Sequence, residues 1–399
     1  MATRDPSRND RFDVVIIGGG ATGLGSAVDA ASRGYRTALF EAATFGAGTS
    51  TRSTKLIHGG VRYLEQFRIG LVREALAERA ILRHIAPDLV KPIGIIVPVR
   101  NAFERLYYAT GLRIYDALAG RANLAPSRSL SASETFEHLP NLRREGIAGG
   151  IRYVDAQFDE LGLLGALAQT ARNLGADLHE HARVVRFIST NGRINGIIAH
   201  AEGRDEMIIS ARTVINATGP RSDVIRRLSD PNATQMLAPS RGSHIVFAAE
   251  VLGRDDGFLI PKTDDKRVIF ALPWKGRALV GTTEVAEAPL DDDPKASDAE
   301  VDYLIAHVNR YLERQVTRNS ILDTYAGLRP LIRAGGKSSA ELSREHLIDV
   351  DSQGLISVLG GKWTTYRCMA KDAIDAAARN GGLTNVRSRT EDLVLSTPR

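Results

Sequence analysis

A run of glycines between a predicted strand and a predicted helix constrains the fold more than any other feature of the sequence. Residues 12–17 are mainly β-branched and apolar, which is typical of a strand buried on both faces of a parallel sheet. Gly18, Gly20 and Gly23 follow in the spacing GxGxxG, and an alanine-rich helical stretch begins at Gly20. Glycines at these positions let the backbone approach a pyrophosphate, whose charge is stabilised at the helix N-terminus. The pattern therefore predicts a dinucleotide-binding turn.

A second predicted strand completes a βαβ unit. It covers residues 37–40, and Glu41 follows at its end, where a carboxylate accepts hydrogen bonds from a ribose in dinucleotide-binding folds. The competing interpretation is a close contact between helix and strand that needs glycine only for packing. That interpretation explains one of the glycines better than three. We therefore expect an α/β protein with a doubly wound domain of the Rossmann type.

Two later segments repeat the arrangement of strand, glycine and helix. Residues 213–216 and 355–359 are short apolar strands, and glycine and threonine follow each of them. NAD enzymes usually continue with further βα units within the first ~150 residues, whereas this pattern breaks into a polar loop after Glu41. A helix N-terminus near Gly361 would stabilise negative charge on a reduced flavin, which favours FAD.

The nucleotide domain is therefore expected to be discontinuous and interleaved with a mixed-sheet substrate domain. The expected boundaries are 10–70, 150–225 and 325–385 for the FAD-binding domain, 71–149 and 226–324 for the substrate or cap domain, and 386–399 for a C-terminal tail.

Composition and charge exclude several classes of protein. The 399 residues carry a net charge of only +5, and basic residues are interspersed with acidic ones, which disfavours a nucleic-acid-binding protein that keeps FAD only as a structural element. A single cysteine, Cys368, forms no internal disulfide, and we expect it to be a small core residue. No apolar run approaches the roughly 18 residues needed to span a bilayer, and residues 1–11 have no signal-peptide core. These features favour a cytoplasmic location.

Six blocks of sequence resemble the FAD-dependent, quinone-linked glycerol-3-phosphate dehydrogenases, which are flavoproteins of the D-amino-acid-oxidase-like superfamily. The blocks are the glycine run at 18–23, TSTRSTKLIHGGVRYLE at 49–65, INATGP at 215–220, RGSHIV at 241–246, YAGLRPL at 325–331 and LGGKWTTYR at 359–367. The resemblance runs from about Asp13 to Arg379. Members of this family usually continue for about another hundred residues in a helical C-terminal domain, and we expect this chain to lack that domain.

The resemblance implies oxidation of sn-glycerol 3-phosphate to dihydroxyacetone phosphate, with hydride transfer to FAD and electrons passed on to a quinone. It implies these cofactor-binding residues: Gly18, Gly20, Gly23, Glu41, Thr49, Ser50, Ser53, Thr54, Lys55, Leu56, Ala217, Gly219, Gly361, Thr364 and Thr365. It further implies His244, Arg329 and Lys362 as catalytic residues, and Arg62, Tyr63 and Arg344 as substrate-binding residues. No metal is expected, and a homodimer is kept as an expectation.

Physical chemistry supports the choice of phosphate over carboxylate. A phosphate monoester carries nearly two charges and is best held by several guanidinium donors, whereas a carboxylate needs only one. The presence of Arg62, Arg329 and Arg344 therefore favours a phosphorylated alcohol over the alternative substrates, an amine or a 2-hydroxy acid. Neighbouring cations would keep His244 neutral and able to accept a proton. The competing interpretations are a buried structural histidine at 244 and a surface ion pair at Arg344.

Three further features carry alternatives. Residues 100–118 form an amphipathic helical pattern that Gly111 is expected to interrupt, and Arg105 and Arg113 flank its aromatic residues. This pattern fits either a helix lying on an anionic membrane or a cap over the active site, and the former would make the protein peripheral on the inner face of the cytoplasmic membrane. His58 is expected to be structural. Arg52 and Trp363 depart from the family pattern and would tune the substrate near the ring.

Overall fold

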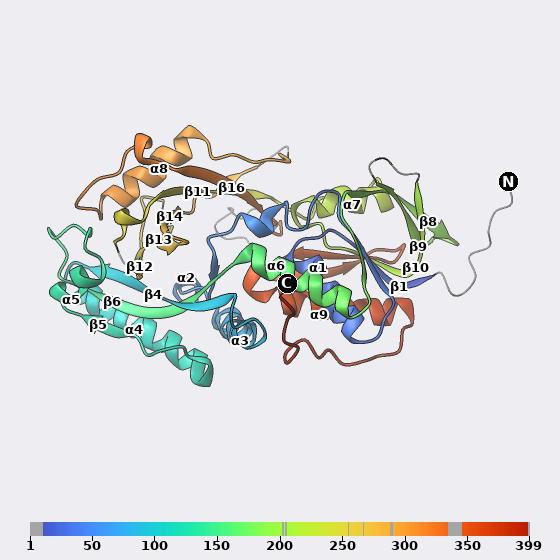
Figure 1. Ribbon diagram of the computed structural model, residues 1–399, viewed down its shortest axis with the longest axis horizontal. Coiled ribbons are helices and arrows are strands. Elements are labelled where there is room, and N and C mark those ends of the chain that lie inside the picture. Colours follow the sequence, from blue (N-terminus) through green and yellow to red (C-terminus); the bar gives the residue numbers. More distant parts are fainter. Residues whose placement is uncertain are drawn as a thin grey trace.

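The computed structural model describes residues 11–397, except for residues 202, 204–205, 254, 266, 288–289 and 334–344. Two sheets lie side by side along the long axis of the molecule (Figure 1). The helices are α1 (Ala21–Ser32), α2 (Arg62–Glu65), α3 (Ile69–Ile85), α4 (Ala102–Ala119), α5 (Ala132–His138), α6 (Glu160–Asn173), α7 (Ser222–Ser229), α8 (Asp298–Asn309) and α9 (Tyr366–Gly381).

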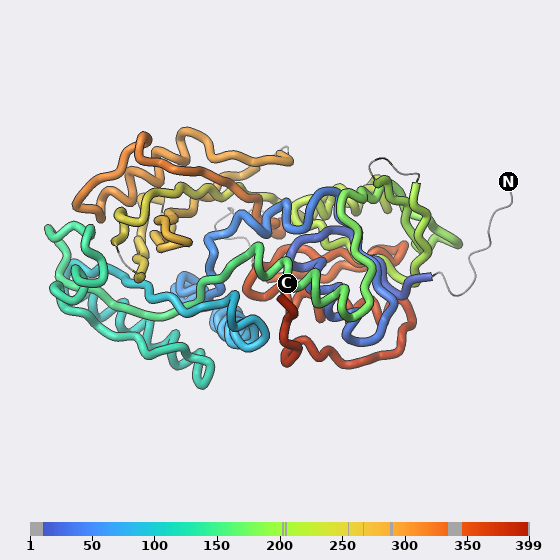
Figure 2. The backbone as a smooth tube through the Cα atoms, viewed as in Figure 1, coloured from blue at the N-terminus to red at the C-terminus, as the bar shows by residue number. Residues whose placement is uncertain are grey.

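The first sheet has the strand order β17-β18-β10-β1-β2-β7, and the hairpin of β8 and β9 extends it from β10. Its strands are β1 (Phe12–Ile17), β2 (Thr37–Phe40), β7 (Asp177–His179), β8 (Ala182–Thr190), β9 (Arg193–Ala201), β10 (Met207–Asn216), β17 (His346–Val350) and β18 (Leu355–Gly360). Strands β18, β10, β1, β2 and β7 run parallel. The two ends of the chain therefore meet in one sheet, as the blue and red parts of the tube show (Figure 2).

The central strand β1 is buried on both faces, as its sequence predicts. Val14 and Ile16 pack on one side against α1, α6 and α9, whereas Val15 and Ile17 pack on the other side against β8 and β9. This alternation follows from the two-residue period of a strand. The burial fixes the carboxyl end of β1, and with it the glycine turn that follows.

The second sheet has the order β15-β11-β14-β13-β12-β4-β6-β3, with β16 paired to β11 and β5 to β6. Its strands are β3 (Leu56–Ile57), β4 (Val90–Val99), β5 (Arg128–Leu130), β6 (Gly149–Phe158), β11 (Ser240–Ala248), β12 (Gly257–Ile260), β13 (Ile269–Trp274), β14 (Arg277–Gly281), β15 (Val285–Ala286) and β16 (Asp323–Arg329). Helix α8 packs on one face of this sheet, and α3 and α4 pack on the other. The predicted fold class, a doubly wound domain with an interleaved mixed sheet, is confirmed.

Sheet membership crosses two of the predicted domain boundaries. Strand β6 extends from residue 149 to 158 and pairs with β4, and β16 pairs with β11, so both belong to the second sheet. The division of the chain into the ranges given above stays a prediction.

Helix α4 is continuous through Gly111, so the expected interruption is wrong. A glycine inside a helix costs about 1 kcal/mol relative to alanine. The next turn buries Leu112 and Tyr115, each 1% exposed, against the second sheet, and this packing outweighs the cost. None of the helices in the described ranges is both long and apolar enough to cross a bilayer.

Candidate functional site

A cavity of about 1270 Å³ lies where the carboxyl ends of the parallel strands face the second sheet. Its lining includes Gly18 after β1, Ala217 after β10, and Gly361 after β18. Ligands of open α/β sheets bind at this edge of the strands. The cavity is large enough for a dinucleotide and a small second molecule.

The glycine turn at the cavity is required by the close approach of neighbouring backbone. Gly18 has φ of 106°, and a Cβ there would lie 2.7 Å from the carbonyl oxygen of Ala217. A Cβ at Gly23 would lie 1.8 Å from the carbonyl oxygen of Gly18. Gly18 and Gly20 line the cavity, whereas Gly23 lets α1 pack against the turn.

The N-terminus of α1 is open toward the cavity. Its N-cap, Gly20, offers no side chain, and no acidic residue lies in the first turn. Ser50 Oγ accepts a hydrogen bond from the Ala21 N–H at 3.0 Å. Glu41 lines the cavity at the end of β2, where its carboxylate accepts hydrogen bonds from the N–H groups of Gly19 at 2.6 Å and Ala43 at 2.8 Å. These groups form the kind of site that binds a pyrophosphate and a ribose.

The predicted cofactor-binding residues of the loop at 49–56 separate into five that line the cavity and one that does not. Thr49, Ser50, Ser53, Thr54 and Leu56 are lining residues. The Lys55 side chain is buried away from the cavity, where its ammonium pairs with Glu160.

Predicted residues from the C-terminal part of the chain divide in the same way. Gly219, Gly361 and Thr364 line the cavity, as does Trp363, which donates from its indole N–H to the Ser50 carbonyl oxygen at 2.7 Å. Thr365 is buried beyond the cavity, with its hydroxyl donating to the Lys362 carbonyl oxygen at 3.2 Å.

His244 lies in β11 with its side chain 2% exposed. Its ring stacks on Tyr325, with 4.7 Å between centroids and 15° between planes, and its Nε2 lies 2.9 Å from Thr54 Oγ1. The pKa of His244 lies well below its ordinary value, mainly because the ring is buried and to a smaller extent because of the charges of Arg329 and Lys55. The imidazole is therefore neutral at physiological pH, as expected, although burial contributes more than the neighbouring cations.

Arg329 is held against the second sheet at the end of β16. Its guanidinium donates to the carbonyl oxygen of Thr283 at 3.0 Å and to Oγ1 of Thr282 at 2.8 Å. The guanidinium lies over Gly242, where a Cβ would come within 2.2 Å of Nη2. Arg329 and His244 both line the cavity.

Three other predicted substrate or catalytic residues line the same cavity. Arg62 begins α2, and Tyr63 follows it. The Lys362 ammonium lies 5.2 Å from the centre of the Tyr63 ring, at cation–π distance. Arg344 lies outside the described residues, so its role stays a prediction.

Sequence reasoning missed several residues that shape the site. Glu160 is 3% exposed and binds Ser53 and Lys55, and Tyr325 carries the His244 ring. Thr283 accepts from the Ser243 N–H at 2.9 Å and donates to a buried carboxylate. The available signal for Glu160 was its position directly after Asp159, the N-cap of α6, and the YAGLRPL block contained Tyr325.

The remaining residues discussed from the sequence divide between the cavity and the fold. His58 lines the cavity, although its N–H also bonds Thr364 Oγ1 at 3.3 Å. Arg52 lines the cavity too, with its guanidinium paired to Asp293 at 2.9 Å. Arg105 donates to the carbonyl oxygens of residues 130 and 148, so it supports the fold, whereas Arg113 is exposed.

One rim of the cavity is exposed and apolar. Phe103 and Leu106 of α4 are 78% and 68% exposed, and Phe67 before α3 is 87% exposed. Tyr107 and Ile114 continue the α4 face at helical spacing. All five also line the cavity. We call this set the apolar rim.

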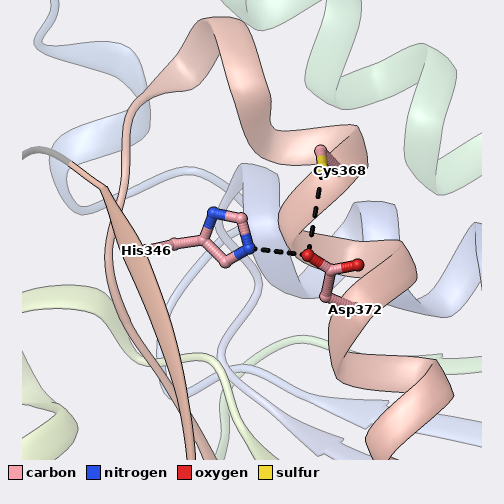
Figure 3. A group of neighbouring side chains, drawn as sticks. All are labelled: His346, Cys368 and Asp372. Carbon is pink, nitrogen blue, oxygen red and sulfur yellow. Dashed lines mark hydrogen bonds and ion pairs between the residues drawn. The ribbon is translucent and has the colours of Figure 1, made fainter. Parts of the chain in front are cut away.

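A separate group of side chains, from β17 and the first turns of α9, has the residue types of a metal site (Figure 3). His346 Nε2 lies 2.8 Å from Asp372 Oδ2, and Cys368 Sγ lies 3.9 Å from the same oxygen. Burial and the nearby carboxylates raise the pKa of the half-buried Cys368 to about 12, so the thiol is protonated. The arrangement is that of a histidine and an aspartate in contact beside a neutral thiol.

The comparison with protein families decides the family. Residues 13–367 match the model of the family described as "DAO: FAD dependent oxidoreductase". The chain belongs to this family of FAD-dependent oxidoreductases. The predicted cofactor class is thereby confirmed.

Individual relatives of this FAD-dependent oxidoreductase carry more specific names. It is 40% identical over 403 residues to mitochondrial glycerol-3-phosphate dehydrogenase of Homo sapiens, with 96% of this chain and 55% of that protein covered. The chain thus spans about half the length of such curated relatives. A solved glycerol-3-phosphate dehydrogenase from Bacillus halodurans complexed with FAD is similar with a TM-score of 0.79 and 30% identity, covering 97% of this chain and 68% of that one. The fold is shared with an L-α-glycerophosphate oxidase from Mycoplasma pneumoniae, at a TM-score of 0.74 and 17% identity. The match covers 98% of this chain and 99% of that one.

The residues of this FAD-dependent oxidoreductase fit the cofactor. Gly18 and Gly20 present only backbone to the cavity, because a Cβ at Gly18 would collide with Ala217 and the N-cap Gly20 has no side chain. Gly361 has φ of 80° and lines the same cavity. Backbone from both chain ends therefore frames one cavity of suitable size.

Proposed function

We propose that the protein oxidises sn-glycerol 3-phosphate to dihydroxyacetone phosphate, with the hydride passed to FAD. The observation that carries the proposal is a single cavity in which Arg62, Arg329 and Lys362 accompany the neutral His244 beside the glycine turns. Several cations in one place suit a phosphate better than a carboxylate. The names of the relatives support the same substrate.

Residues from both ends of the chain would hold FAD. Gly18, Gly20 and Glu41 would bind its adenosine diphosphate half, with Gly23 allowing the turn to form. Thr49, Ser50, Ser53, Thr54 and Leu56 would lie along the flavin, together with Ala217, Gly219, Gly361 and Thr364. Lys55 and Thr365 would support these segments from behind. When bound, FAD supplies the two-electron acceptor that the reaction needs.

The side chains around the cavity would divide the remaining work. His244 would accept the proton of the substrate hydroxyl, because its imidazole is neutral. Arg329 and Lys362 would stabilise negative charge that develops on that oxygen. Arg62, Tyr63 and Arg344 would bind the phosphate.

The apolar rim supports a second part of the proposal, in which the electrons leave to a quinone at an anionic membrane. Phe103, Leu106 and Phe67 are exposed beside the opening of the cavity, and the exposed Arg113 lies on the same helix. Apolar side chains accompanied by basic charge bind membrane surfaces. The protein would then be peripheral on the inner face of the cytoplasmic membrane. A homodimer stays a prediction.

Anaerobic reduction of the bound flavin tests the substrate. Purified protein loaded with FAD is mixed with glycerol 3-phosphate, and the flavin absorbance is followed. Bleaching is the expected result. No bleaching by glycerol 3-phosphate, together with bleaching by an amine or a 2-hydroxy acid, would instead favour the alternative substrate class.

A further inference from the structure

The imidazole of His244 contacts residues from several segments other than its own strand. Tyr325 stacks on the ring, and a Cβ at Gly281 would come within 2.1 Å of His244 Cδ2, so glycine is needed to leave room for the ring. The polar contact recorded for the ring joins Nε2 to Thr54 Oγ1 at 2.9 Å. A hydroxyl both donates and accepts, so Thr54 can hold Nε2 in either neutral form of the ring.

The residues on both sides of Thr54 are tied to the same buried carboxylate. Glu160 accepts hydrogen bonds from the N–H of Ser53 at 3.1 Å and from the Ser53 hydroxyl. The other oxygen of Glu160 pairs with the ammonium of Lys55, which also donates to the carbonyl oxygen of Thr51 at 2.9 Å. Glu160 and Lys55 are 3% and 7% exposed.

The backbone of this loop leaves Thr54 little freedom. Lys55 has φ of 63°, in the left-handed region that residues other than glycine rarely adopt. Its N–H donates to Ser53 Oγ at 3.0 Å. Tyr325, which carries the His244 ring, donates from its hydroxyl to the Ser53 carbonyl oxygen at 2.8 Å, and the Lys55 ammonium lies 4.7 Å from the centre of the Tyr325 ring. The loop, the tyrosine and the carboxylate thus form one connected unit around the histidine.

We propose that Thr54 is a positioning residue that fixes the orientation of the His244 ring through Nε2, and that the buried pair of Glu160 and Lys55 holds Thr54 in place. The hydroxyl can bond Nε2 in either neutral form of the imidazole, so the contact ties the ring to the loop whichever nitrogen carries the proton. The role in catalysis rests on the proposed function, in which His244 accepts a proton.

The hydrogen bond at Nε2 is measured directly, without any turnover. Nitrogen NMR of the FAD-loaded protein with labelled histidine reports hydrogen bonding at each ring nitrogen through its chemical shift. The chain has nine histidines, and the signals of residue 244 are assigned by their loss in His244→Gln. We expect the same Nε2 signal in the wild type and in Thr54→Ser, which keeps the hydroxyl. Thr54→Val keeps the shape but removes the hydroxyl, and it should shift the Nε2 signal.

A matched pair of variants tests the buried carboxylate. Glu160→Gln should also shift the His244 Nε2 signal, because it weakens the pairing that holds the loop. Glu78 is the control, since it is likewise a buried glutamate paired with a cation, Arg367, at 2.9 Å, and burial raises its pKa as it does that of Glu160. Glu78→Gln should leave the His244 signals unchanged.

Kinetics then connect the position of the ring to the reaction. Thr54→Val should slow flavin reduction by glycerol 3-phosphate about 10-fold to 100-fold with little change in KM, and Thr54→Ser should restore it. An unchanged Nε2 signal in both Thr54→Val and Glu160→Gln would overturn the proposal, as would equal disturbance by Glu78→Gln. Absence of reduction in the wild type would instead reject the proposed substrate and leave the NMR result standing as its own test.

Discussion

Gly242 is the position at which a single methyl group tests whether the site depends on the place of Arg329. An alanine Cβ at 242 would lie 2.2 Å from Nη2 and 2.5 Å from Nη1 of the Arg329 guanidinium. The guanidinium would therefore have to move by about 1 Å to reach ordinary van der Waals contact. That movement is enough to break its hydrogen bonds to Thr282 at 2.8 Å and to Thr283 at 3.0 Å.

The expected cost follows from the size of this displacement. A misplacement of about 1 Å in a catalytic constellation costs about 100-fold in rate, or roughly 2.7 kcal/mol of transition-state stabilisation. The assay is stopped-flow reduction of the bound flavin by glycerol 3-phosphate in Gly242→Ala. Gly70→Ala is the control, because a Cβ at Gly70 meets nothing within 4 Å. Reduction of Gly242→Ala at the wild-type rate, with a normal flavin spectrum, would refute the reasoning.

Three other outcomes follow from the site. Arg329→Ala should keep FAD bound, measured by its absorbance, and lose reduction by glycerol 3-phosphate. Because the pKa of His244 is lowered in the folded protein, the folded protein binds fewer protons at this residue than the unfolded chain does at low pH. The free energy of unfolding therefore decreases as the pH falls below about 6.5, the ordinary pKa of histidine. The melting temperature of His244→Gln should accordingly fall less between pH 7 and pH 5 than that of the wild type. Replacing both Phe103 and Leu106 with serine should weaken sedimentation with anionic vesicles while flavin reduction is unchanged, and undiminished sedimentation would exclude the apolar rim as the contact.

Local chemistry explains which parts of the fold could be predicted. The strand at 12–17 and the glycine turn after it were predictable, because the strand's burial and the helix N-terminus follow from neighbouring residues. The continuity of α4 through Gly111 was not, because it depends on packing of Leu112 and Tyr115 against another sheet. Tertiary burial of this kind outweighs a local preference of about 1 kcal/mol.

The site shows the same division. Arg329, Lys362 and His244 lie in blocks with a recognisable pattern, and all three line one cavity. Glu160 is separated from Lys55 by 105 residues, and no local pattern connects the two. The sequence therefore indicated the chemistry that faces the cavity, whereas the groups that hold it in place from behind became evident only from the contacts between distant segments.

A crystal structure of the protein with FAD and dihydroxyacetone phosphate tests the central claim most directly. The account predicts the flavin between the glycine turns of the two chain ends, the phosphate beside Arg62, and the carbonyl oxygen within hydrogen-bonding distance of Arg329 or Lys362. Binding of the phosphate away from these cations, or with its carbonyl remote from both His244 and the flavin, would contradict it.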